Sequence, residues 1–187
     1  MFDIIGEAKV FTKMDLKTGF HQIRVKPGDV EKSAFNTKYG QYEYLVLPMG
    51  LCNAPATFQS LMNSIFHDCM DGFIVVYMDD LLIFSKDKES HYKHLELVLS
   101  RLEKHELYVA PKKYEFMKDN IDFLGLLIGK DGIRVNPKKV EILKTWPKPS
   151  SVTEIRSFLG LIQFFRRFIP DFSKIASPLT DFTKKDS

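Results

Sequence analysis

The sequence predicts an α+β fold, because stretches patterned like strands alternate with stretches patterned like helices along its 187 residues. Hydrophobic residues make up 44% of the chain, charged residues 27%, and the net charge is only +3, a composition that excludes a disordered segment. No apolar run is long enough to cross a bilayer, so we expect no membrane partner. Two cysteines are too few for a disulfide framework, and we interpret Cys52 and Cys69 as small core residues of an intracellular protein.

The first fifty residues are predicted to form short strands. Lys17-Thr18-Gly19 separates the first two, and a segment containing Gly40 separates the next two, which indicates a hairpin. The four predicted strands cover residues 10–15, 21–25, 33–37 and 42–47.

Two amphipathic helices and a second group of strands follow. Asn53 is a candidate cap, and Pro55 suits the first turn of a helix, where a missing N–H costs nothing. Apolar residues then recur at three- and four-residue steps up to Cys69, and a second helix with the same periodicity starts at about His91. The predicted strands cover residues 73–77, 81–84, 121–128 and 133–135.

The last part of the sequence is predicted to be helical. Asn136-Pro137 opens a short helix, and Ser151 with Glu154 has the spacing of a capping box. The helix after this box is expected to continue through Ile169 and to end at Pro170. Residues 130–187 carry 12 Lys and Arg against 6 Asp and Glu, which suggests a polyanionic partner, although a solvated lysine-rich surface explains the same charge.

Two adjacent aspartates are the most informative residues. Asp79 and Asp80 lie between the apolar runs 73–76 and 81–84, so they occupy the tip of a predicted buried hairpin. Neighbouring carboxylates there repel each other and lose hydration, and a bound cation would compensate them. The alternative is an ordinary solvated turn, but the turn contains no Gly or Asn chosen for backbone geometry.

A third carboxylate is needed to complete a site for a hard divalent cation. Asp15 is the best candidate because it ends an apolar strand, and Thr18-Gly19 just after it can offer backbone N–H groups to a phosphate. Three aspartates holding two Mg²⁺ (or Mn²⁺) ions ~3.5–4 Å apart are typical of metal-assisted phosphoryl transfer. The weaker candidates for the third carboxylate are Asp3, Asp68, Asp71 and Asp122.

Four ordered motifs resemble those of reverse transcriptases. The Tyr-Met-Asp-Asp sequence at residues 77–80 is similar to the signature of retroviral and retrotransposon enzymes. The chain resembles the gypsy-type LTR retrotransposon enzymes in particular, through the stretch from residue 146 to residue 179. The other matching motifs are Asp-Leu-Lys-Thr-Gly-Phe-His-Gln-Ile at 15–23, Leu-Pro-Met-Gly-Leu-Cys-Asn-Ala-Pro-Ala-Thr-Phe-Gln at 47–59 and Phe-Leu-Gly at 123–125.

This resemblance implies an RNA-directed DNA polymerase that joins a primer 3′-OH to a deoxynucleoside triphosphate with two metal ions. It implies a polymerase palm, an antiparallel sheet packed on helices, with partial fingers in residues 1–129, the hairpin at about 26–47 being the fingers part, and a helical thumb in residues 130–187. The implied partners are an RNA or DNA template with its primer and a dNTP, in the cytoplasm, the nucleus or a virus-like particle.

The resemblance also assigns roles to single residues. Phe20 would exclude a ribose 2′-OH, while Met49 and Gln59 would line or support the nucleotide pocket, although core packing explains Met49, Pro55 and Gln59 nearly as well. The implied catalytic and metal-binding residues are Asp15, Asp79 and Asp80. The implied nucleotide-binding residues are Thr18, Gly19, Phe20, Met49 and Gln59. The implied primer or template contacts are Tyr77, Met78, Leu124, Gly125, Arg166 and Arg167.

Two further expectations concern the histidines and the ends of the chain. We interpret the histidines as surface residues rather than metal ligands; these are His21, His91, His94 and His105. Only fourteen residues precede Asp15, so we expect the N-terminal fingers segment to be absent or encoded elsewhere. The surface left open would invite self-association. This leaves an alternative function, an inactive retroelement relic that binds nucleic acid or protein.

Overall fold

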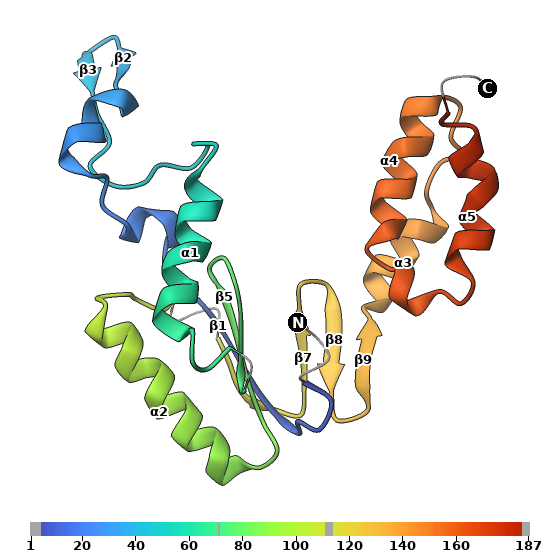
Figure 1. The fold of residues 1–187 in the computed structure, drawn as a ribbon, viewed down its shortest axis with the longest axis horizontal. Coiled ribbons are helices and arrows are strands. Elements are labelled where there is room, and N and C mark those ends of the chain that lie inside the picture. The colour runs from blue at the N-terminus through green and yellow to red at the C-terminus, as the bar shows by residue number, and fades with distance from the viewer. Residues whose placement is uncertain (1–4, 71, 111–113, 185–187) are drawn as a thin grey trace. The chain divides into compact units, whose positions relative to one another are not determined.

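The computed structural model describes residues 5–70, 72–110 and 114–184, and the chain divides into two compact units (Figure 1). The first unit comprises Met1–Phe123 with Ile128–Gly132, and the second comprises Leu124–Leu127 with Ile133–Ser187. The fold is of mixed α+β type, as predicted. No helix within the described ranges is both long and apolar enough to cross a membrane.

A four-stranded antiparallel sheet forms the centre of the first unit. Its order is β4-β5-β1-β6. The predicted strands at 10–15, 73–77 and 81–84 are confirmed, whereas β6 was not anticipated from the sequence. The strand bounds are Val10–Asp15 for β1, Ile74–Tyr77 for β4, Asp80–Ser85 for β5 and Glu115–Lys118 for β6.

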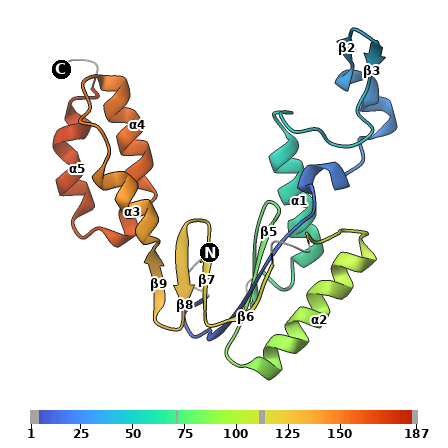
Figure 2. The same cartoon turned by 180° about the vertical axis from the view of Figure 1, so that it is seen from behind.

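Two helices, α1 (Ala54–Phe66) and α2 (Lys88–Lys104), pack on one face of this sheet (Figure 2). Strand side chains alternate between faces, so Met14 and Leu16 point into the core with the helices while Lys13 and Asp15 take the other face. The fully buried helix residues include Phe58, Met62, Phe66 and Val98. The acidic residue of β1 is therefore carried on the face of the sheet that the helices leave open.

The start of α2 and the capping of α1 differ from the predictions. The α2 helix begins at Lys88, earlier than His91, because the Asp87 carboxylate caps it by accepting a hydrogen bond from Ser90 N at 2.8 Å. Asn53 makes no side-chain capping bond, so the predicted cap is wrong, although Pro55 does occupy the first turn of α1.

The burial of one cysteine and two histidines differs from the prediction. Cys69 is buried as predicted, but Cys52 is exposed because it precedes the first turn of α1. His91 is fully buried and His94 is partly buried, so neither is a surface residue. The charged residues around them in the sequence had suggested exposure. In the structure α2 turns both rings toward the sheet, where the hydroxyl groups of Thr12 and Ser85 bind them.

The segment after β1 is not the predicted strand over 21–25. Residues Gly19–Gln22 form a 3₁₀ helix, because Thr18 has a left-handed backbone (φ 55°) that ends the extended conformation. The hairpin predicted over 33–47 is present but shorter, with β2 at Phe35–Thr37 and β3 at Gly40–Tyr42.

A second antiparallel sheet has the order β7-β8-β9. The single strand predicted over 121–128 is wrong, because Leu124 (φ 53°) and Gly125 (φ 79°) form a turn that splits it into two strands. A turn over residues 130–131 joins β8 to β9, the strand predicted at 133–135. The strand bounds are Asn120–Phe123 for β7, Leu126–Gly129 for β8 and Gly132–Val135 for β9.

Three helices make up most of the second unit: α3 (Pro137–Lys144), α4 (Val152–Gln163) and α5 (Phe172–Asp181). Asn136 and Ser151 cap the first two, as predicted. The predicted continuation of α4 to Ile169 is wrong. Bonds between residues three apart, such as Phe165 N to Ile162 O at 2.9 Å, tighten its end and lead into a 3₁₀ turn over Arg166–Phe168.

Candidate active site

Strand pairing brings the three predicted aspartates to one end of the first sheet. Asp15 pairs directly with Asp80 across β1 and β5, and Tyr77 pairs with Asp80 across β4 and β5. Met78 and Asp79 therefore form the two-residue turn of the hairpin. The backbone carbonyl of Asp79 accepts a 2.9 Å hydrogen bond from Leu16 N, which ties this turn to the end of β1.

Gln59 of α1 holds the hairpin turn. Its Oε1 accepts a hydrogen bond from Met78 N at 2.7 Å, and its Nε2 donates to Val76 O at 3.2 Å. Met78 has a left-handed backbone (φ 53°), which is unfavourable for a residue with a side chain. The turn has no Gly or Asn, so this side-chain support from the helix stabilises a conformation that the local sequence disfavours.

The surroundings of Asp80 raise the pKa of its carboxyl group. Burial, a side-chain hydrogen bond with Asp15 and, to a smaller extent, the charges of Asp15 and Asp79 together raise the pKa of Asp80 to about 6. Lys13 opposes this shift, with Nζ 3.8 Å from Asp80 Oδ1. Sequence reasoning missed Lys13, yet its position two residues before Asp15, on the same face of β1, was a readable signal.

The carboxylates of the three aspartates are suitable ligands for a hard divalent cation, but their positions do not form a metal site. Among the described residues, no three His, Cys, Asp or Glu side chains are grouped so that they could hold a metal ion as they stand. Carboxylate oxygens are nevertheless the ligands that Mg²⁺ prefers. The pKa of Asp80 is raised chiefly by burial, then by its hydrogen bond with Asp15 and by neighbouring negative charge, and a bound cation would offset each of these effects.

The weaker acidic candidates lie elsewhere or have other partners. Asp68 forms a bidentate ion pair with Arg101, whose two terminal nitrogens lie 2.5 and 2.7 Å from the carboxylate oxygens. These hydrogen bonds keep the pKa of the Asp68 carboxyl well below its usual range. Asp122 belongs to β7. Asp3 and Asp71 lie outside the described residues.

The predicted phosphate-binding turn lies directly against the hairpin. A side chain at Gly19 would place its Cβ 3.3 Å from Asp79 Cβ, and Gly19 has φ 30°, so both space and backbone favour glycine. The hydroxyl of Thr18 already donates its hydrogen bond within the protein, from Oγ1 to Lys17 O at 2.7 Å. Any phosphate contact from this turn would therefore come from its backbone.

The other predicted nucleotide residues have contrasting environments. Phe20 packs edge-to-face on Phe58, with ring centroids 5.4 Å apart, at the margin of the core. Met49 is 68% exposed and Pro55 is also exposed, so core packing does not explain either residue. Tyr77, expected to contact the primer, is 44% exposed.

The remaining predicted primer contacts belong to the second unit. Leu124 and Gly125 form the turn between β7 and β8, where a Cβ on Gly125 would lie 3.4 Å from Lys139 Cε. Arg166 and Arg167 are exposed on the 3₁₀ turn that follows α4.

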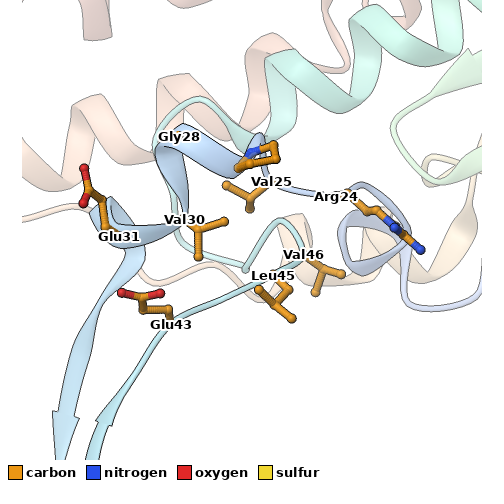
Figure 3. A pocket seen from close by; sticks show the side chains of 9 residues that line it. Arg24, Val25, Gly28, Val30, Glu31, Glu43, Leu45 and Val46 are labelled. Carbon is orange, nitrogen blue, oxygen red and sulfur yellow. The ribbon is translucent and has the colours of Figure 1, made fainter.

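A hollow of about 870 Å³ lies beside the β2–β3 hairpin (Figure 3). Its apolar middle is flanked by Glu31 and Glu43 on one side and by Arg24 on the other. None of the aspartates lines it. The complete lining is Arg24, Val25, Pro27, Gly28, Val30, Glu31, Glu43, Leu45 and Val46.

Comparison with known proteins identifies the family. Residues 2–128 match the family model described as "Reverse transcriptase (RNA-dependent DNA polymerase)". The chain belongs to the reverse transcriptase family. Membership implies RNA-directed DNA polymerase chemistry by family, and members generally use divalent metals.

The curated relatives are polyproteins of LTR retrotransposons. The chain is 44% identical over 180 residues to the Retrovirus-related Pol polyprotein from transposon opus of Drosophila melanogaster, and 39% identical over 183 residues to that from transposon gypsy. These matches cover 96% and 98% of this chain but only 18% of each polyprotein. The predicted resemblance to gypsy-type reverse transcriptases is therefore confirmed.

Solved reverse transcriptases have the same fold. A foamy viral protease-reverse transcriptase in complex with double-stranded DNA matches 96% of this chain with a TM-score of 0.85 and 28% identity, covering 32% of the viral chain. The foamy viral enzyme in complex with an RNA/DNA hybrid matches 98% with a TM-score of 0.81 and 27% identity, covering 25% of its chain.

Proposed function

We propose that this chain is the palm and thumb portion, with partial fingers, of an RNA-directed DNA polymerase from a gypsy-type LTR retrotransposon. It would extend a primer 3′-OH on an RNA or DNA template with deoxynucleoside triphosphates. The first unit would supply the palm, with β2 and β3 as the fingers part, and the second unit the thumb. The observation that carries the proposal is the pairing of Asp15 with Asp80 beside Asp79 at one end of the sheet.

Asp15, Asp79 and Asp80 would hold two Mg²⁺ or Mn²⁺ ions. Bound there, such ions neutralise developing charge on the transferred phosphoryl group and activate the attacking hydroxyl. The protein would contribute mainly by positioning the primer and the nucleotide, because phosphoryl transfer needs little covalent catalysis. The burial and the neighbouring carboxylates that raise the pKa of Asp80 support a cation-binding role, since a cation would favour the ionised carboxylates.

The residues around the aspartates would orient the substrates. The backbone of Thr18 and Gly19 would bind the triphosphate, and Phe20, held on Phe58, would stand where a ribose 2′-OH needs space. Met49, exposed, is available to the incoming sugar. Gln59 would act by holding the turn that carries Met78, beneath the primer terminus.

In the second unit, the Leu124-Gly125 turn would grip the primer. Arg166 and Arg167 would face the phosphate backbone of the duplex, a role supported by their exposure on the 3₁₀ turn after α4.

Primer extension on poly(rA)/oligo(dT) with Mg²⁺ or Mn²⁺ tests the proposal. The chain should extend the primer, and Asp79→Asn should reduce the rate by at least about 100-fold, since it removes a carboxylate from the metal site. Lys174→Ala, on the exposed surface of α5, is the matched control and should leave the rate unchanged.

Two results would count against this function. Extension that survives Asp79→Asn would remove the metal role of the aspartates. No extension by the unaltered chain would favour the alternative, a retroelement relic that binds nucleic acid or protein without polymerising.

A further inference from the structure

The turn at Thr18-Gly19 has a conformation that its own sequence does not explain. Thr18 (φ 55°) and Gly19 (φ 30°) are both left-handed, a backbone conformation that is unfavourable for threonine because of its Cβ. Gly19 tolerates such a backbone, but Thr18 does not do so readily. Contacts from outside the turn must therefore hold it.

The side chain of Gln22 supplies such contacts. Its Nε2 donates to Lys17 O at 2.6 Å and to Tyr108 O at 3.1 Å, while its Oε1 accepts from Tyr108 N at 2.6 Å. One amide group thus binds both polar groups of the Tyr108 backbone and the carbonyl that precedes the turn. It thereby adds side-chain hydrogen bonds to the isolated antiparallel bridge that pairs Leu16 with Val109.

The backbone around the turn is tied to the same neighbour. Lys17 N donates to Tyr108 O at 2.8 Å, and Ala110 N donates to Asp15 O at 2.8 Å. Gln22 therefore closes a ring of hydrogen bonds that joins the two ends of the turn to the segment after α2. On the opposite side the turn is limited by Asp79, which lies 3.3 Å from the place of a Gly19 Cβ.

We infer that Gln22 is a positioning residue for nucleotide binding: it fixes the Thr18-Gly19 backbone beside Asp79 so that the N–H groups of the turn meet the triphosphate. The inference rests on the proposed function. Gln22 itself touches no substrate, because all three of its bonds are spent on the protein backbone. Its loss should therefore affect capture of the deoxynucleotide more than the chemical step.

The informative substitution is Gln22→Met, which keeps the length and volume of the side chain but removes its hydrogen bonds. It should raise KM for dTTP on poly(rA)/oligo(dT) about tenfold while kcat changes less than about twofold, since the hydrogen bonds position a binding group. Gln22→Glu keeps the acceptor for Tyr108 N but places a charge against two carbonyls, so it should not rescue KM. Gln41→Ala, at an exposed position on β3, is the control and should match the unaltered chain.

Hydrogen–deuterium exchange gives a readout that does not depend on activity. In Gln22→Met, exchange should rise in the peptide that covers residues 16–22 and at the amide of Tyr108, and should stay unchanged in β2 and β3.

The outcomes separate the inference from the proposed function. An unaltered chain that does not extend primers overturns the proposed function, and exchange then still decides whether Gln22 holds the turn. An active chain whose Gln22→Met variant keeps a normal KM, or loses kcat alone, overturns the inference. Unchanged exchange at Tyr108 would also overturn it.

Discussion

At the scale of single residues, side chains outside a turn stabilise backbone conformations that the sequence of the turn disfavours. Gln59 supports left-handed Met78 from α1, and Gln22 supports left-handed Thr18 from the 3₁₀ helix. In both cases a side-chain amide offers a donor and an acceptor at once, which lets it bind a backbone N–H and a backbone carbonyl together. These two glutamines flank the aspartates, so the geometry of the proposed site depends on them.

The first prediction at this scale concerns Phe20. If its ring occupies the space of a 2′-OH, Phe20→Val should lower discrimination against ribonucleotides at least about tenfold, because a smaller side chain admits the hydroxyl. Incorporation of rUTP and dTTP by the same preparation measures the ratio. Loss of the edge-to-face contact with Phe58 should also lower the free energy of unfolding by about 1–3 kcal/mol.

Tyr39→Val is the control for this substitution, because Tyr39 is 77% exposed at the tip of the β2–β3 hairpin. It should alter neither quantity. Unchanged discrimination in an active Phe20→Val variant would show that another residue excludes the 2′-OH.

At the scale of elements, a buried hydroxyl–imidazole network joins α2 to the sheet. His91 bonds Thr12 Oγ1 on β1 at 2.7 Å and Ser85 Oγ on β5 at 2.8 Å, and Ser85 Oγ also bonds His94 Nδ1 at 2.7 Å. The ring of His94 stacks on Phe73, with centroids 3.9 Å apart. This network fixes the helix along the strands more specifically than apolar packing alone.

This network predicts acid sensitivity. Burial lowers the pKa of His91 from 6.5 to about 4, with a smaller contribution from His94. Since the folded state holds the neutral ring, its stabilisation is present above pH 6.5 and is lost as the pH falls toward 4. The loss amounts to on the order of 3 kcal/mol when the pH reaches the lower value.

The measurement is urea denaturation of the chain and of His91→Gln across this pH range. Glutamine keeps a polar group but does not titrate, so the variant should be less stable at pH 7 and should lose less on acidification. His105→Gln, at an exposed position after α2, should behave like the unaltered chain. Equal losses in all three proteins would exclude His91 as the titrating group.

At the scale of the whole molecule, charge is divided between the two ends of the chain. Residues 130–187 have twice as many basic as acidic residues, and most of them belong to the second unit, whereas the aspartates belong to the first. An excess of basic residues attracts a polyanion such as nucleic acid, which is the partner proposed for the second unit.

The prediction at this scale concerns the salt dependence of duplex binding. Arg166→Ala combined with Arg167→Ala should weaken binding to a primer–template duplex and should lower the slope of log K against log salt by about 1–2, because each phosphate contact contributes about 0.9. Fluorescence anisotropy between 50 and 200 mM salt measures this slope.

Lys174→Ala combined with Lys184→Ala is the matched control, since it removes the same charge from residues that pair with Asp171 and Asp181. Its slope should stay close to that of the unaltered chain. If both double variants have the same slope, general charge rather than phosphate contact explains the binding.

The sequence predicted the main strands of the first sheet, the start of α1 and the caps of α3 and α4, because these depend on local pattern and on neighbouring residues. It failed where the decisive contact is distant or the backbone is left-handed. The turn at Leu124-Gly125 was not foreseen, nor was the end of α4 at Gln163. His91 was placed on the surface because a residue's own neighbours do not reveal what the helix packs against.

By itself, the sequence determined the family and named the three aspartates, because both are carried by short ordered motifs. Only the tertiary structure decided how Asp15 meets Asp80, since the pairing of β1 with β5 joins residues far apart in the chain. It also showed that Lys13 and Gln22 are partners of that site and that Gln59 acts by holding the hairpin turn. The physical reason is that hydrogen bonds and burial act through space, and side chains meet there irrespective of their separation in sequence.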